Sequence, residues 1–250
     1  MSKIQIVALG SWSSPFHIDS PFTLKYEEID HEWKEDLIQL GWDQSVLSKS
    51  ELKEIRQQTH VMWAEKEINS TLISPKRSSS NDVSTDTHER IVDPLCTPIA
   101  QLTMAQNSAL LLKQLAEYAT VLYFDPSMKV LTPRMAQELI VDDPVTLLHM
   151  LIDFWGDREG MYTSGMQVFA LPDLKVTGSD PQSATLQATV FSGAAQMICE
   201  NAQLKVGESF RASESFPWFE IVEWTRRHDS AQDDEETSQN PYGILHLQLN

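Results

Sequence analysis

The stretch Met161–Asn201, MYTSGMQVFALPDLKVTGSDPQSATLQATVFSGAAQMICEN, decides the fold of this 250-residue chain. Its first part is an apolar run that ends at Leu171-Pro172-Asp173, where the proline predicts a turn before an edge strand through Leu174 and Val176. From about residue 180 to 201, apolar residues recur at the spacing of a helix that buries one side. That side comprises Leu186, Val190, Ala194, Met197 and Ile198. Small residues such as Gly193 would let this helix lie close to a sheet.

A strand before this stretch would complete a hairpin. Residues Val145–Trp155 are apolar at most positions, which fits either a strand or a helix. The GDREG segment that follows favours a strand, whose antiparallel partner would be Met161–Ala170. Further strands are predicted at 120–124, 204–206, 218–225 and 243–249, and helices at 103–119 and from the Thr132-Pro133 pair to about 139.

The N-terminal part combines two predicted strands with two predicted helices. The strands cover residues 4–10 and 22–29, and the first helix covers 32–40 and would end at Gly41. Ser48 and Glu51 have the spacing of a capping box, in which each side chain hydrogen-bonds the other's backbone N–H. They open a second predicted helix over Ser48–Ile68.

The segment from Ser70 to Arg90 is rich in Ser, Thr and charged residues, and large apolar residues are scarce in it. It cannot bury enough apolar surface to offset its ordering entropy, so we expect a long flexible polar loop near 70–90. This predicts an N-terminal α/β region at 1–69, a linker or loop at 70–91, and a C-terminal α+β domain at 92–250. The alternative is that 92–250 forms one continuous domain with 1–69. In either case the pattern predicts an α+β fold, a mostly antiparallel sheet covered by amphipathic helices.

The net charge of −17 limits the partners of the chain. It argues against nucleic acids and anionic membranes, which both attract clustered Lys and Arg, and it permits a basic protein partner. No run of about 18 apolar residues is present, so no membrane span is predicted. The two cysteines, Cys96 and Cys199, lie too far apart for a disulfide framework or a zinc motif. We expect a soluble, cytoplasmic protein.

The sequence lacks the motifs of the common enzyme classes. It has no G-x-G-x-x-G, no phosphate-binding P-loop and no G-x-S-x-G elbow, and its seven histidines include no i, i+4 pair. The sequence therefore predicts no catalytic residue, no cofactor and no metal site. The remaining enzymatic possibility is a cleft assembled from distant residues, for which the candidates are His149, Asp153, Asp125 and Cys199.

Two segments resemble the domain of unknown function 4261 family: Thr163–Thr177, TSGMQVFALPDLKVT, and the later AAQMICENAQLKVGESF. Gly165 and Phe169 would belong to the first family segment, and the Gly207-Glu208-Ser209 turn to the second. Ala170 stands where the family usually has glycine, and Lys175 where it favours an acid. The resemblance covers about residues 92–210, and it implies a fold class and no established activity.

Two functions remain open at this point. One is a non-enzymatic acidic protein that binds a partner protein, as an immunity or stress-type factor would. The other is a hydrolase or transferase that uses the scattered His, Asp and Cys residues named above. Convergence of those side chains in three dimensions would favour the second function.

Overall fold

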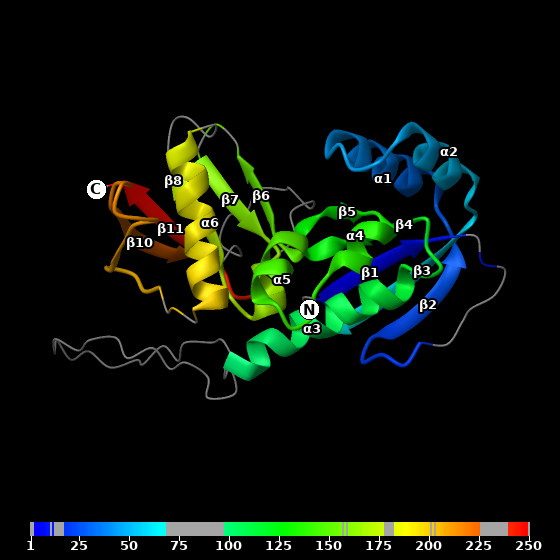
Figure 1. The fold of residues 1–250 in the computed structure, drawn as a ribbon, viewed down its shortest axis with the longest axis horizontal. Coiled ribbons are helices and arrows are strands. Elements are labelled where there is room, and N and C mark those ends of the chain that lie inside the picture. The colour runs from blue at the N-terminus through cyan, green and yellow to red at the C-terminus, as the bar shows by residue number, and fades with distance from the viewer. Residues whose placement is uncertain are drawn as a thin grey trace, which may run out of the picture.

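The chain folds into two sheets that lie side by side, each with its own helices (Figure 1). The computed structural model describes residues 3–10, 12, 18–68, 98–156, 158, 160–177, 183–200, 202, 204–225 and 240–249. In these residues the fold is α+β, with six α-helices and two sheets, and the predicted fold class is confirmed. Every strand pair is antiparallel except β8–β11. The stretch predicted to be a flexible loop, 70–90, lies outside the described residues.

Sheet A has five strands in the order β2-β3-β1-β4-β5. Because β1 pairs with both β3 and β4, the sheet combines strands from before and after residues 70–91. The strands are β1 (Lys3–Leu9), β2 (Thr23–Glu28), β3 (His60–Glu67), β4 (Val121–Phe124) and β5 (Lys129–Leu131).

Helices cover both faces of sheet A. Helices α1 (His31–Asp43) and α2 (Lys49–Gln57) pack on one face, where Val7 and Leu9 of β1 are fully buried. Helix α3 (Pro98–Leu115) lies on the other face against Ile4, Ile6 and Ala8, as the two sides of the sheet in Figure 1 show. Alternate residues of β1 therefore enter two different apolar cores.

Sheet B has six strands in the order β6-β7-β8-β11-β10-β9. Helix α6 (Ala184–Cys199) lies across one face and packs on β6, β7 and β8 (Figure 1). A Cβ at Gly193 would lie 2.8 Å from Leu174 Cδ1, so glycine is what permits this close approach. The strands are β6 (Asp153–Gly156), β7 (Gly160–Ser164), β8 (Asp173–Thr177), β9 (Ser209–Phe210), β10 (Phe219–Thr225) and β11 (Ile244–Leu249).

Short helical segments join the two sheets into one continuous core. Helices α4 (Pro133–Glu138) and α5 (Pro144–Leu151) pack against α3, and α5 also packs against α6. The 3₁₀ turns η2 (Asp125–Ser127) and η3 (Met166–Phe169) contact each other. The core cluster around them runs from Ile4 in sheet A to Leu247 in sheet B.

Helix starts follow the side-chain caps that the sequence offers. The capping box of Ser48 and Glu51 is present at α2, and Thr132 caps α4 ahead of Pro133, as predicted. Asp30 and Asp143 cap α1 and α5. Each cap satisfies backbone N–H groups that have no partner within the helix.

The ends of α2, α4 and α5, in contrast, are closed by lysines from other elements. Lys34 donates to the carbonyls of Arg56 and Gln58, at 3.3 and 3.1 Å, where α2 ends. Lys113 of α3 donates likewise to carbonyls at the end of α4. Lys129 of β5 donates to His149 O at 2.7 Å and to Ile152 O at the end of α5. Cations suit this end of a helix because its unpaired carbonyls carry partial negative charge.

The predicted helix over Ser48–Ile68 is wrong in its second half. Helix α2 ends at Gln57, and His60–Glu67 forms β3, which lies between β2 and β1. Both faces of this strand are buried, Val61 toward α1 and α2 and Met62 toward α3. A strand buried on both sides does not alternate apolar and polar residues, so its pattern also fits helical spacing.

Four further predictions need correction. Val145–Trp155 is not one strand: the Asp143 cap and Pro144 start α5, and β6 begins only at Asp153. Leu174 and Val176 belong to an interior strand, because β11 pairs in parallel with β8. Residues 204–206 form no strand, and α1 continues past Gly41 to Asp43, since Gly41 is buried against Leu47.

Candidate functional site

The face of sheet B opposite α6 carries a row of five aromatic, polar or charged side chains, one from each of five strands. The register places Trp155 opposite Tyr162, Tyr162 opposite Lys175, Lys175 opposite His246, and His246 opposite Glu223. Directly opposed residues project to the same side of a sheet. Their neighbours along each strand, such as Leu174 and Leu245, are fully buried on the α6 side. Within the described part of the chain, α6 is the α-helix that packs on sheet B, and we call the surface opposite it the open face of sheet B.

An aromatic stack forms one end of the row. The rings of Trp155 and Tyr162 lie parallel, with centroids 4.4 Å apart and an interplanar angle of 11°. Lys175 Nζ lies 5.1 Å from the centroid of the Tyr162 ring, a cation–π distance. Trp155 on the edge strand is 38% exposed.

The other end of the row is ionic. His246 Nε2 lies 2.8 Å from the Thr225 hydroxyl, and Glu223 is exposed beside it. Burial lowers the pKa of His246. The charge of Lys175 lowers this pKa further, whereas the charge of Glu223 raises it. Neutral imidazole is therefore favoured at this position near neutral pH.

The open face continues on β9 and β10 beyond the row. Glu220, opposite Gln248, is exposed there. Just outside the bounds of these two strands, the Arg211 guanidinium lies 4.7 Å from the ring of Trp218, which is 47% exposed. Aromatic residues and arginine are enriched in protein interfaces.

The end of this face nearest sheet A is closed. Ser164 Oγ donates to Pro126 O in η2 at 3.1 Å. Asp153 lies close enough to Lys129 to raise the pKa of that ammonium, although burial outweighs this and lowers it overall. Asp153 is therefore half-buried between the sheets, whereas Trp155 lies at the open part.

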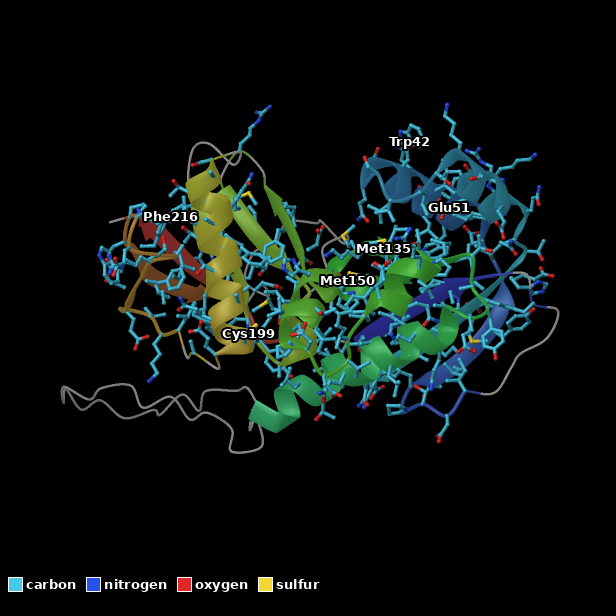
Figure 2. All side chains as sticks on the ribbon, viewed as in Figure 1. Trp42, Glu51, Met135, Met150, Cys199 and Phe216 are labelled. Atoms are coloured by element: carbon cyan, nitrogen blue, oxygen red, sulfur yellow. The ribbon has the colours of Figure 1, made fainter. Side chains whose placement is uncertain are left out.

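The structure separates His149 and Cys199, two of the four candidate catalytic residues. The His149 ring contacts Phe191 of α6 at 5.0 Å between centroids, and Cys199 lies eight residues further along that helix (Figure 2). Eight residues correspond to about 12 Å of helix, beyond proton-transfer reach. Burial, with Asp143 and Glu200, also raises the pKa of the Cys199 thiol, which disfavours the nucleophilic thiolate.

The two aspartates of the candidate set also lie in different environments. Asp125 lies in η2, where Tyr123 Oη donates to Oδ1 at 3.4 Å. Burial raises the pKa of Asp125, against the opposing effects of Tyr123 and Lys3. Burial and then the Asp125 charge raise the pKa of Tyr123. Asp153 instead lies near Lys129. Within the described residues no three His, Cys, Asp or Glu side chains are arranged to hold a metal ion.

The segment that carries the family resemblance folds around a buried carboxylate. Asp173 accepts hydrogen bonds from Thr163 Oγ1, the Met166 backbone N–H and Asn240 Nδ2, at 3.2, 3.2 and 2.8 Å. Three donors satisfy a buried carboxylate. The network ties β7, η3 and β8 to the start of β11, so a structural role explains it. Ala170 in this segment has a φ of 55°, the left-handed conformation that glycine adopts most easily.

No family model, curated protein or solved structure matches the chain. The resemblance to the domain of unknown function 4261 family therefore stays a prediction. Among the described residues, no helix is long and apolar enough to cross a membrane.

Sequence reasoning missed the open face. Its residues come from five strands, and the pairing of β8 with β11 joins segments about 70 residues apart. A local signal was present only within single strands: Lys175 stands between the apolar Leu174 and Val176, the alternation of a half-buried strand.

Proposed function

We propose that this chain is a non-enzymatic, acidic protein of the cytoplasm that binds a basic partner protein through the open face of sheet B. A role of the immunity or stress type is consistent with such binding. The observation that carries the proposal is the row of aromatic and ionic side chains on a sheet face that α6 leaves uncovered.

Charge favours a basic partner. The chain has a net charge of −17, and the exposed acids Glu220 and Glu223 lie beside the central row. Aromatic side chains with flanking charges supply contact area and orientation in protein interfaces. The separation of His149 from Cys199 removes support for an assembled catalytic dyad.

The test is affinity capture from the source cells with three forms of the protein. These are the wild type, an open-face variant with Glu220→Lys and Glu223→Lys, and a control with Glu32→Lys and Asp36→Lys. The control makes the same charge change on exposed positions of α1. The captured protein is then purified and its affinity is measured by calorimetry at two salt concentrations.

We expect one basic protein to bind the wild type and the α1 control, with weaker binding at higher salt. The open-face variant should bind about tenfold more weakly or worse, because reversed charges meet a basic surface. Equal binding by the open-face variant, or loss confined to the α1 variant, would contradict the proposal.

A further inference from the structure

The row on sheet B ends in an aromatic ring at an edge strand. From the geometry of that end we infer which group of the partner binds there. We propose that an extended segment of the partner pairs with β6 and places an arginine guanidinium on the outer face of Trp155. This inference rests on the proposed function of the open face.

The order of the side chains defines the next position in the row, beyond Trp155. Tyr162 lies between Lys175 and Trp155 in the register, and it contacts both, at 5.1 and 4.4 Å. Neighbouring strands are about 4.8 Å apart, which matches the spacing of stacked groups. The ring of Trp155 therefore has Tyr162 on one face and points its other face beyond the edge of the sheet, consistent with its 38% exposure.

Strand β6 offers main-chain groups at the same edge. It is the first strand in the order of sheet B and pairs only with β7 among the described strands. An added strand would place one side chain directly opposite Trp155, as the next member of the row. Recognition of an extended segment by an open sheet edge combines such backbone pairing with side-chain specificity.

Charge and shape select arginine for that position. A planar guanidinium stacks on an indole ring and is attracted by its π-electrons. The net charge of −17 favours a cation over a neutral or acidic side chain. The two cations would then enclose the stack, Lys175 on one side and arginine on the other.

The probe is the peptide acetyl-Thr-Val-Arg-Val-Thr-amide, titrated into the whole protein at millimolar concentration. Its matched control replaces arginine by citrulline, which keeps the planar group and removes the charge. Binding is measured in every protein form from backbone amide resonances in two-dimensional NMR. In the forms that retain Trp155, its indole N–H resonance, assigned with Trp155→Leu, locates the bound peptide. The matched protein control is Trp218→Leu, since Trp218 is also exposed and already has Arg211 on its ring.

We expect the arginine peptide to shift the Trp155 resonance and the citrulline peptide to bind about two- to fivefold more weakly. Trp155→Leu should weaken binding of the arginine peptide by a similar factor, and Trp218→Leu should leave it unchanged. An unshifted Trp155 resonance, equal binding of both peptides, or equal losses in both tryptophan variants would overturn the inference.

The outcome separates this inference from the proposed function. If Trp155→Leu binds the captured partner like the wild type while the Glu220 and Glu223 reversals abolish capture, the arginine position is wrong and the open face still binds. If the reversals have no effect either, both proposals are overturned.

Discussion

Sheet A has helices on both faces, whereas sheet B has α6 on one face and an open face on the other. The difference appears in the side chains. Strand β1 buries every residue from Ile6 to Leu9, while β8 alternates buried Leu174 and Val176 with half-buried Lys175. A sheet buried on both sides contributes stability, and a sheet covered on one side leaves functional groups accessible. We therefore expect mutations to separate the two roles.

The largest effect is expected beneath α6, the covered side of sheet B. Val190→Asp would bury an unpaired charge at a fully buried position and should cost more than about 4 kcal/mol, a large share of the roughly 5–15 kcal/mol that stabilises a typical domain. Urea denaturation followed by circular dichroism measures the change in the free energy of unfolding. Gln187→Asp, at an exposed position of the same helix, is the control and should change little. A folded Val190→Asp protein would show that this face is not part of the core.

A smaller effect is expected where the two sheets meet. Lys129→Met keeps the apolar stem and removes the donors to His149 O and Ile152 O, which should cost about 2 kcal/mol. Urea denaturation of this variant is compared with that of Lys49→Met, which removes an exposed lysine at the start of α2. Equal stability of Lys129→Met and the wild type would mean that water replaces the ammonium without loss.

The ion cluster on sheet A should contribute less than these buried contacts, because its lysines are largely exposed and solvent screens the interaction. Hydrogen bonds from Lys25 and Lys3 lower the pKa of Glu65 from 4.5 to about 2. The folded state thus favours the ionised form, and the stabilisation is present above pH 4.5 and is lost as the pH falls toward 2.

Glu65→Gln tests this dependence. Its free energy of unfolding should fall below that of the wild type at pH 7, and the difference should shrink at pH 3. Glu67→Gln, at an exposed position of the same strand, serves as the control. A difference that is the same at both pH values would rule out ionisation of Glu65 as its source.

The smallest effect on stability is expected on the open face. Trp155→Leu removes one stacked ring at an exposed edge and should cost less than about 1 kcal/mol. Trp63→Leu is the matched change on the covered face of sheet A, where Trp63 packs against Trp33 at 5.0 Å, and it should cost more. If urea titration shows the same loss of unfolding free energy in Trp155→Leu and Trp63→Leu, the two faces do not differ in their contribution to stability.

Helix α6, which is buried on one side only, was predicted well from the sequence. The buried side of α6 could be predicted because Leu186, Val190 and Ala194 repeat at helical spacing, and all three are buried. Strand β3 could not be predicted, because both of its faces are covered and the alternation of apolar and polar residues disappears. The caps at Ser48 and Thr132 were readable because they depend on residues only three positions apart.

The candidate site depends on how distant strands and helices are arranged, so it could not be predicted from the sequence. His149 and Cys199 were plausible by residue type, but α5 and α6 place them at different heights along the interface between these helices. The row from Trp155 to Glu223 exists only through the register of five strands, and no local pattern encodes a parallel pair such as β8–β11.

The lysines that close helix ends also affect chemical labelling. Lys34, Lys113 and Lys129 direct their amines at carbonyls inside the fold, three of only 19 basic residues. An amine-reactive ester needs a neutral, accessible nitrogen, so these three positions should acylate last, after exposed amines such as Lys49 and Lys53. Mass spectrometry of a labelling time course would thus report on local opening: late acylation of Lys129 marks release of α5 from sheet A.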